Sequence, residues 1–221
     1  MARPANPAIR QQLIDAAISE FAERGLRDTR VSDITDRAGT SKGTFYLHFE
    51  SKEQIFEHIA DTFLGSVQNH LAAYRSALDM QVGHDQIHRI VDLDIALYSY
   101  LADQHLPLRV VMEGAAGTPY AYLSEQFIEN IEKYIRELLL TSPGSIARMS
   151  PEADIDAVAI LCTGMFIMVA HRLCRGENLD LRRLSLQMHR MMCCGILRAE
   201  FAQEIRTMID QYETSIQLPP P

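Results

Sequence analysis

Apolar residues recur along this chain at steps of three and four positions, which is the spacing that places side chains on one face of an α-helix. Glycines and prolines interrupt the pattern, and Ser41 and Ser51 stand where helix N-caps are expected. Pro151, followed by Glu152, is typical of a helix start. The pattern predicts about nine helices: from Ile9 to Gly25, 32–38, from Lys42 onward, 51–78, 85–104, 106–116, 120–141, 151–175 and 180–212.

Neither a β-hairpin signal nor a GxGxxG motif occurs in this sequence. We therefore expect an all-α fold. The composition, with 47% hydrophobic and 23% charged residues, is typical of a soluble globular protein. Residues 1–12 lack the apolar segment of a signal peptide, and the longest uncharged apolar run, Ala157–Ala170, is too short to span a bilayer. These features predict a cytoplasmic protein without a membrane partner, in which that run forms a buried or interface helix.

The net charge of −8 is unevenly distributed. Residues 1–52 hold eight Lys and Arg against seven Asp and Glu, for a local net charge of +1. The rest of the chain carries −9 and would repel phosphate. The charge pattern thus permits DNA binding at the N-terminal end alone.

A helix-turn-helix pattern spans Val31–Phe49, where two short helices are joined by a three-residue turn that contains Gly39. The inner faces of the two helices are apolar and would pack together through Ile34, Ala38, Phe45 and Phe49. The outer face of the second helix carries a cation, a hydroxyl, a phenol and an imidazole, which suits the major groove of DNA: Lys42, Thr44, Tyr46, Leu47 and His48.

The stretch from Ile34 to Glu53 reads Ile-x-x-x-Ala-Gly-x-Ser-Lys-Gly-Thr-Phe-Tyr-x-His-Phe-x-Ser-Lys-Glu, and it resembles the DNA-binding signature of the TetR family of bacterial regulators. The resemblance covers about residues 9–60. The chain departs from the usual pattern at Arg30, Thr35, Thr40 and Leu47. The family implies a helix-turn-helix DNA-binding domain at 1–52, a linking helix at about 52–78, and an effector-binding and dimerisation domain at 53–221.

The resemblance also implies which residues meet operator DNA. Tyr46, Lys52 and the backbone around Lys42 and Gly43 would hold phosphates. Packing under the fourth helix is the alternative for Tyr46, helix capping is the alternative for His48, and a solvated surface position is the alternative for Lys52. The full expected set is Ser32, Thr40, Ser41, Lys42, Gly43, Thr44, Tyr46, Leu47, His48 and Lys52.

In the remainder of the chain, the resemblance implies a ligand pocket and a homodimer formed by the helices at 151–175 and 180–212. The sequence offers one apolar stripe at Cys162, Phe166, Val169 and Leu173, and another at Leu184, Met188, Met191 or Met192, Gly195 and Ala199. Core packing and a dimer interface both fit these stripes. Candidate ligand contacts, for each of which core packing is the alternative, are Tyr98, His105, Met112, Tyr122, Phe127, Phe166 and His171.

The resemblance implies a ligand-responsive regulator, namely a repressor that a small-molecule effector releases from double-stranded operator DNA. An activator, a ligand-independent regulator, and a helical carrier or enzyme with a structural N-terminal unit are the alternatives. We expect no enzyme activity and no cofactor, since no nucleophile, base and acid are organised together. We expect a solvated face without metal at His84, His88 and Asp92, and reduced, mostly buried thiols at Cys162, Cys174, Cys193 and Cys194.

Overall fold

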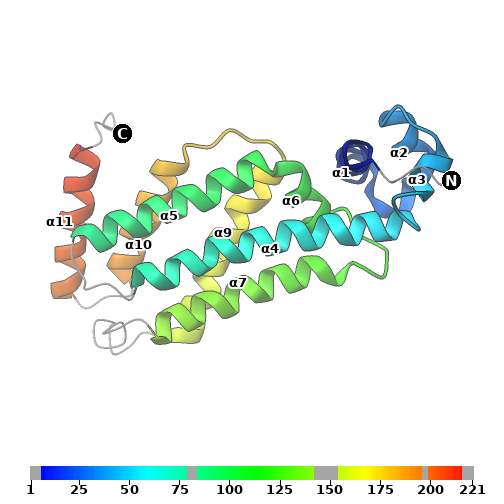
Figure 1. Ribbon diagram of the computed structural model, residues 1–221. Coiled ribbons are helices and arrows are strands. Elements are labelled where there is room, and N and C mark those ends of the chain that lie inside the picture. The colour runs from blue at the N-terminus through cyan, green and yellow to red at the C-terminus, as the bar shows by residue number, and fades with distance from the viewer. Residues whose placement is uncertain (1–5, 79–83, 142–153, 196–198, 216–221) are drawn as a thin grey trace. The chain divides into compact units, whose positions relative to one another are not determined.

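The computed structural model describes residues 6–78, 84–141, 154–195 and 199–215, which form ten α-helices and no strand (Figure 1). The expected all-α fold is confirmed. The helices are α1 (Pro7–Asp28), α2 (Val31–Arg37), α3 (Lys42–Tyr46), α4 (Lys52–Leu78), α5 (His84–Asp103), α6 (His105–Met112), α7 (Tyr122–Thr141), α9 (Ile155–Cys174), α10 (Leu181–Gly195) and α11 (Ala199–Ser215).

Several helix boundaries differ from the sequence prediction, and the helix expected at 106–116 ends at Met112. The helix expected at 180–212 is two helices, α10 and α11, which pack on each other. Helix α1 does not stop at Gly25: this glycine, with φ of 75°, forms a kink, and the helix continues to Asp28. Helix α9 begins at Ile155 behind Asp154, whose carboxylate accepts hydrogen bonds from two backbone N–H groups, and the predicted start at Pro151 lies outside the described residues.

The chain divides into two compact units. The first consists of Met1–Ser66 together with Gln104–Phe127, and the second of Val67–Asp103 together with Ile128–Pro221. Helices α4 and α7 each continue from one unit into the other. The functional boundary expected at residue 52 falls within the first unit and stays a prediction.

The core of the first unit is aromatic. Phe21 of α1, Phe45 of α3 and Phe56 of α4 are fully buried, and the rings of Phe21 and Phe56 meet edge to face with centroids 5.5 Å apart. Ile34 of α2 is fully buried as well. Since each of the first four helices contributes a buried side chain, the core fixes the helix-turn-helix to α1 and α4.

Helix α6 also belongs to the first unit, where it packs on α1. The backbone N–H of Leu26 donates to the carbonyl of Gly114 over 2.8 Å. A Cβ atom at Gly114 would lie 2.7 Å from the backbone oxygen of Val110, which is closer than real Cβ contacts. Glycine is therefore required where the chain leaves α6 and meets the end of α1.

Another contact in the first unit joins the N-terminal half of α1 to α4. The guanidinium of Arg10 lies 4.9 Å from the centre of the Phe49 ring and 3.3 Å from Nε2 of His58. Burial and the charge of Arg10 lower the pKa of His58 below its ordinary value of 6.5, and Asp61 acts in the opposite direction. Neutral His58 thus suits this contact.

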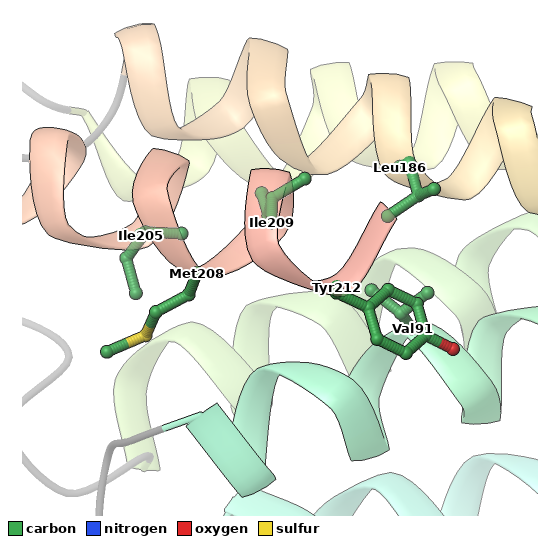
Figure 2. Packing of buried hydrophobic residues seen from close by; sticks show 6 residues of the cluster. All are labelled: Val91, Leu186, Ile205, Met208, Ile209 and Tyr212. Carbon is green, nitrogen blue, oxygen red and sulfur yellow. The ribbon is translucent and has the colours of Figure 1, made fainter. Parts of the chain in front are cut away.

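In the second unit, α11 packs on α5 and α10 (Figure 2). The cluster between them contains Val91, Leu186, Ile205, Met208, Ile209 and Tyr212. The hydroxyl of Tyr212 donates to Asp92 over 2.6 Å, and its ring centre lies 4.4 Å from that of His88. Of the face expected to be solvated at His84, His88 and Asp92, Asp92 is exposed, whereas His88 is half-buried against Tyr212 of α11; the side chain of His84 lies outside the described residues.

Helix α9 is long and apolar enough, by length and composition alone, to cross a membrane, although the apolar run within it is short. Its inner face is core: Cys162, Phe166 and Leu173 are buried, and Cys174 is buried at its end. The first predicted stripe therefore belongs mostly to the core of the unit. The side chains of Met192, Cys193 and Cys194 lie outside the described residues.

Gly114→Ala is expected to destabilise the protein by about 1–3 kcal/mol, because the added methyl group overlaps the carbonyl of Val110. Gly65→Ala is the matched control, since no atom of the described residues comes within 4 Å of its added Cβ in α4. That change should stabilise the protein by about 0.5–1 kcal/mol through helix propensity. Urea unfolding of both variants measures the difference; equal effects would contradict the close approach at Gly114.

The His58 contact predicts a dependence of stability on pH. Because the pKa of His58 is lower in the folded than in the unfolded state, the unfolded state binds more protons. The contribution is fully present above about pH 6.5 and is lost as the pH falls through the folded pKa. His58→Gln should flatten the unfolding free energy between pH 5 and 7, measured by urea titration at each pH.

Arg10→Met is the companion variant, because it removes the charge that opposes protonation of His58. It should flatten the same profile in part, since burial remains. A profile that neither substitution changes would show that His58 does not control acid stability.

Candidate DNA interface

Helix α3 starts at a well-formed N-cap. The Ser41 hydroxyl accepts a hydrogen bond from the backbone N–H of Thr44 over 3.1 Å, and it lies 2.9 Å from the Thr44 hydroxyl. Gly39 supplies the turn before it with φ of 63°, and the N–H of Thr40 donates to the carbonyl of Thr35. The predicted N-cap at Ser41 is confirmed. The N-cap therefore fixes the residue at which α3 begins.

Ion pairs fix α2 against α1. The guanidinium of Arg37 contacts Glu20 over 2.7 Å and Glu23 over 2.8 Å, and Arg24 approaches Glu20 at 3.3 Å. The hydrogen bond that Arg37 donates to Glu23 is the largest of the effects that raise the pKa of Arg37. The carboxylate of Glu20 lies between the guanidinium groups of Arg37 and Arg24, and the residue is only 4% exposed. Sequence reasoning missed this network, because its partners stand 14 and 17 positions apart.

The outer face of α3 and the residue that follows it are exposed. Phe45 is fully buried, whereas Tyr46 is 58% exposed and Leu47 is 59% exposed. Lys42 and Gly43 are exposed as well. Packing of Tyr46 beneath α4, the alternative considered above, does not fit this exposure. The face offers a cation, a phenol and an apolar side chain to a partner, which is the chemistry that phosphates and base edges require.

Among the other predicted DNA contacts, Ser41 is exposed, and the remainder are less accessible. Ser32, Thr40, Thr44 and His48 are half-buried. Nδ1 of His48 is buried and has no hydrogen-bond partner among the described residues. Half-burial leaves part of each side chain accessible at the edge of the face.

The ammonium of Lys52, which was predicted to contact a phosphate, is directed to the end of α1 in this structure. Its ammonium donates to the backbone carbonyls of Leu26, Arg27 and Thr29 at 2.7, 3.2 and 2.8 Å. An ammonium has three donors, and all three are used within the protein. A phosphate contact would require breaking at least one of these bonds.

The predicted ligand contacts divide between the two units. Tyr98 and Phe166 lie together in the second unit, with stacked rings whose centroids are 5.6 Å apart. His171 is in the second unit as well, where it is half-buried. The other four belong to the first unit, where Phe127 packs 6.4 Å from Phe63 and Tyr122 is exposed: His105, Met112, Tyr122 and Phe127.

Polar residues that sequence reasoning missed lie near Tyr98. The buried hydroxyl of Ser185 donates to Asp94 over 2.9 Å, and Nδ1 of His189 lies 3.5 Å from the same carboxylate. Burial, followed by the charge of Asp94, raises the pKa of Tyr98, so its phenol stays protonated. That hydroxyl donates to the sulfur of Met188 at 3.8 Å, a weak acceptor. The helical spacing of Asp94 and Tyr98 on α5 could have placed both on one face.

Large apolar side chains are exposed on α9 and α10. Ile160, Leu161 and Met168 of α9 are 56%, 67% and 62% exposed, and Met191 of α10 is 57% exposed. Leu184 of α10 is exposed as well. We call these five residues the apolar face. Gly164 and Ala157 lie among them on α9 and are exposed too, so a partner helix could approach closely.

A sequence model of a family described as "Bacterial regulatory proteins, tetR family" matches residues 13–59. The HTH-type transcriptional repressor KstR2 of Mycobacterium tuberculosis (strain ATCC 25618 / H37Rv) is 30% identical over 152 residues, which is 67% of this chain and 73% of the repressor. The probable acrEF/envCD operon repressor of Escherichia coli (strain K12) is 26% identical over 71% of this chain and 72% of its own.

Solved structures agree with the fold. The ketosteroid transcriptional regulator KstR2 of Mycobacterium tuberculosis superposes with a TM-score of 0.61 and 25% identity, over 86% of this chain and 95% of that one. A complex of SmeT with triclosan has a TM-score of 0.65 and 18% identity, over 87% and 93% of the two chains, and shows the shared fold.

These relatives confirm the function class expected from the sequence, a DNA-binding regulator and not an enzyme. The similarity to KstR2 extends well beyond the helix-turn-helix, over two thirds of the chain. In this chain, α3 begins at a capped turn, and its outer face is exposed while Phe45 on its inner face is buried. The chain belongs to the TetR family of bacterial transcriptional regulators.

Proposed function

We propose that this protein is a homodimeric repressor that binds operator DNA through α3 and is released by an apolar small-molecule effector. The single observation that carries DNA binding is the exposed outer face of α3, with Lys42, Tyr46 and Leu47 outward and Phe45 buried beneath them. Relatives named as repressors support the direction of regulation.

The exposed residues have different proposed contacts with DNA. Lys42 supplies a cation and Tyr46 a phenolic hydroxyl for phosphate oxygens, as the family resemblance implies. Leu47 has no polar group and suits the methyl group of thymine in the major groove. His48 and Thr44, half-buried at the same edge, are second candidates for base contacts.

The apolar face is the proposed dimer interface. Five large apolar side chains of α9 and α10 are exposed to solvent, which favours their burial against a partner. A two-fold axis would pair α9 and α10 with their symmetry mates, so that each face covers its copy. The interface thus uses α9 and α10 of the predicted final helices, while α11 contributes to the core of the unit.

The proposed effector contacts Tyr98 and Phe166. Both side chains are buried and stack on each other, so an effector that reaches them would replace core contacts, and the Tyr98 hydroxyl, whose acceptor here is a thioether, would gain from a ligand carbonyl or hydroxyl. An elongated, ring-containing compound with one polar end fits this chemistry. The relative named a ketosteroid regulator and the relative in complex with triclosan support an apolar ligand class.

Release follows from a two-state equilibrium. Operator binding requires the two recognition helices of the dimer to enter successive major grooves, about 34 Å apart. An effector that binds better to a state with another separation weakens DNA binding, and operator DNA must weaken effector binding by the same factor. Equal effector affinity with and without operator would refute this mechanism.

Fluorescence anisotropy with DNA from upstream of the protein's own gene tests the proposal. We expect tight binding that unrelated competitor DNA does not displace and that weakens steeply with salt. Tyr46→Ala should weaken operator binding roughly 10- to 100-fold through loss of a phosphate contact, with the melting temperature unchanged. Tyr122→Ala, an equally exposed tyrosine of the first unit, is the control and should bind DNA normally.

Several results of this assay would count against the proposal. One such result is weak binding with the same affinity for every DNA sequence, confirmed by selection from random DNA. It would mean that the helix-turn-helix has only a structural role. Ring-containing apolar compounds are then added to the wild-type complex. If such a compound binds without releasing operator, DNA binding stands and effector release fails.

Leu161→Glu tests the apolar face. Because a two-fold interface contains every substitution twice, two carboxylates would be buried, and we expect mostly monomer at micromolar concentration by analytical ultracentrifugation. Leu140→Glu, on α7, is the control and should remain dimeric. Loss of the dimer should also weaken operator binding, because two half-sites can no longer be held together. A dimeric Leu161→Glu variant would contradict the assignment.

A further inference from the structure

The ammonium of Lys52 lies at the end of another helix. Lys52 is the first residue of α4, but its three acceptors, the carbonyls of Leu26, Arg27 and Thr29, stand at the end of α1, 23 to 26 positions earlier. The final carbonyls of a helix lack partners within it and carry partial negative charge. A cation supplied by a distant helix therefore completes the C-terminal end of α1.

Two further hydrogen bonds hold the turn at the end of α1. The buried hydroxyl of Thr29 donates to the carbonyl of Gly25 over 2.7 Å, and the N–H of Leu26 donates to Gly114 over 2.8 Å. Helix α2 begins at Val31, two residues after Thr29. The direction in which the chain enters the helix-turn-helix is thus set by the turn that Lys52 holds.

We propose that Lys52 is a positioning residue for operator binding, which orients α2 and α3 by holding the end of α1, and that it does not bind a phosphate of DNA. The inference rests on the proposed function for its link to operator DNA. The geometry carries it: all three donors are used at 3.2 Å or less, and none remains for a phosphate oxygen. Lys42, which is exposed on α3, takes the phosphate role.

The two roles differ in their dependence on salt. A cation that neutralises a phosphate releases a counterion, so removing it lowers the slope of log Kd against log[salt] by about 0.9. It also weakens binding to all DNA alike. A positioning residue leaves the slope unchanged, because no charge near the phosphates is lost. Its removal misplaces the recognition helix, so specific binding weakens more than non-specific binding.

The experiment compares Lys52→Met with Lys42→Met in the full chain, using operator and random duplexes at several salt concentrations. Methionine keeps the apolar stem in both variants and removes the charge. For Lys52→Met we expect an unchanged slope, at least about tenfold weaker operator binding and nearly unchanged random-DNA binding. For Lys42→Met we expect a slope lowered by about 0.9 and similar losses on both duplexes. A lowered slope for Lys52→Met, with equal losses, would overturn the proposal.

Thermal unfolding without DNA supplies a second readout. Lys52→Met should lower Tm because three carbonyls lose their donor, and Lys42→Met should leave it unchanged. This difference is expected even if wild-type protein shows no specific DNA binding, so failure of the proposed function would be recognised separately. An unchanged Tm in Lys52→Met would overturn the proposal.

Lys52→Arg keeps the charge and covers the case in which the methionine variant folds poorly. The planar guanidinium cannot direct its donors as the ammonium does toward these three carbonyls. We expect Lys52→Arg to bind operator more weakly than wild type with an unchanged salt slope. Full recovery of operator affinity and Tm by arginine would show that charge alone is required, and would overturn the positioning role.

Discussion

The buried aromatic core of the first unit is the constraint on which DNA binding depends. Helices α2 and α3 have only seven and five residues, too few for either to persist alone in water. Their stability comes from burial of Ile34 and Phe45 beside Phe21 and Phe56, supported by the ion pairs of Arg37. The polar outer face of α3 can be varied to read DNA only because the inner face is held in this way.

Local sequence signals predicted this part of the fold well. The N-caps at Ser41 and Ser51, the turn at Gly39 and the inward positions of Phe45 and Phe49 depend on neighbours within a few residues, and a reader of the sequence can see them. The role of Lys52 depends on carbonyls more than twenty positions away. Its place in a DNA-binding motif suggested a phosphate partner, whereas the folded chain offers its own backbone.

The packing of the second unit was much harder to predict from the sequence. Helix α9 is apolar almost all round, so its sequence pattern marks no single inner face. Only the packed structure separates Cys162 and Phe166, which are buried, from Ile160 and Leu161, which are exposed. The division into α10 and α11 escaped the pattern as well, because apolar residues recur in both helices. Ligand contacts were the least predictable, since aromatic residues fill cores and pockets alike.

The first unit is discontinuous in sequence, and this affects how such proteins can be recombined. The family signature ends at residue 59, yet the unit also contains Gln104–Phe127, whose Gly114 carbonyl receives the N–H of Leu26. A chimera that exchanges only the first sixty or so residues would combine two surfaces from different proteins. In this chain those surfaces meet so closely that position 114 must be glycine. Exchange of DNA specificity between relatives therefore calls for two segments transplanted together, and a fragment cut after α4 would lack part of its own core.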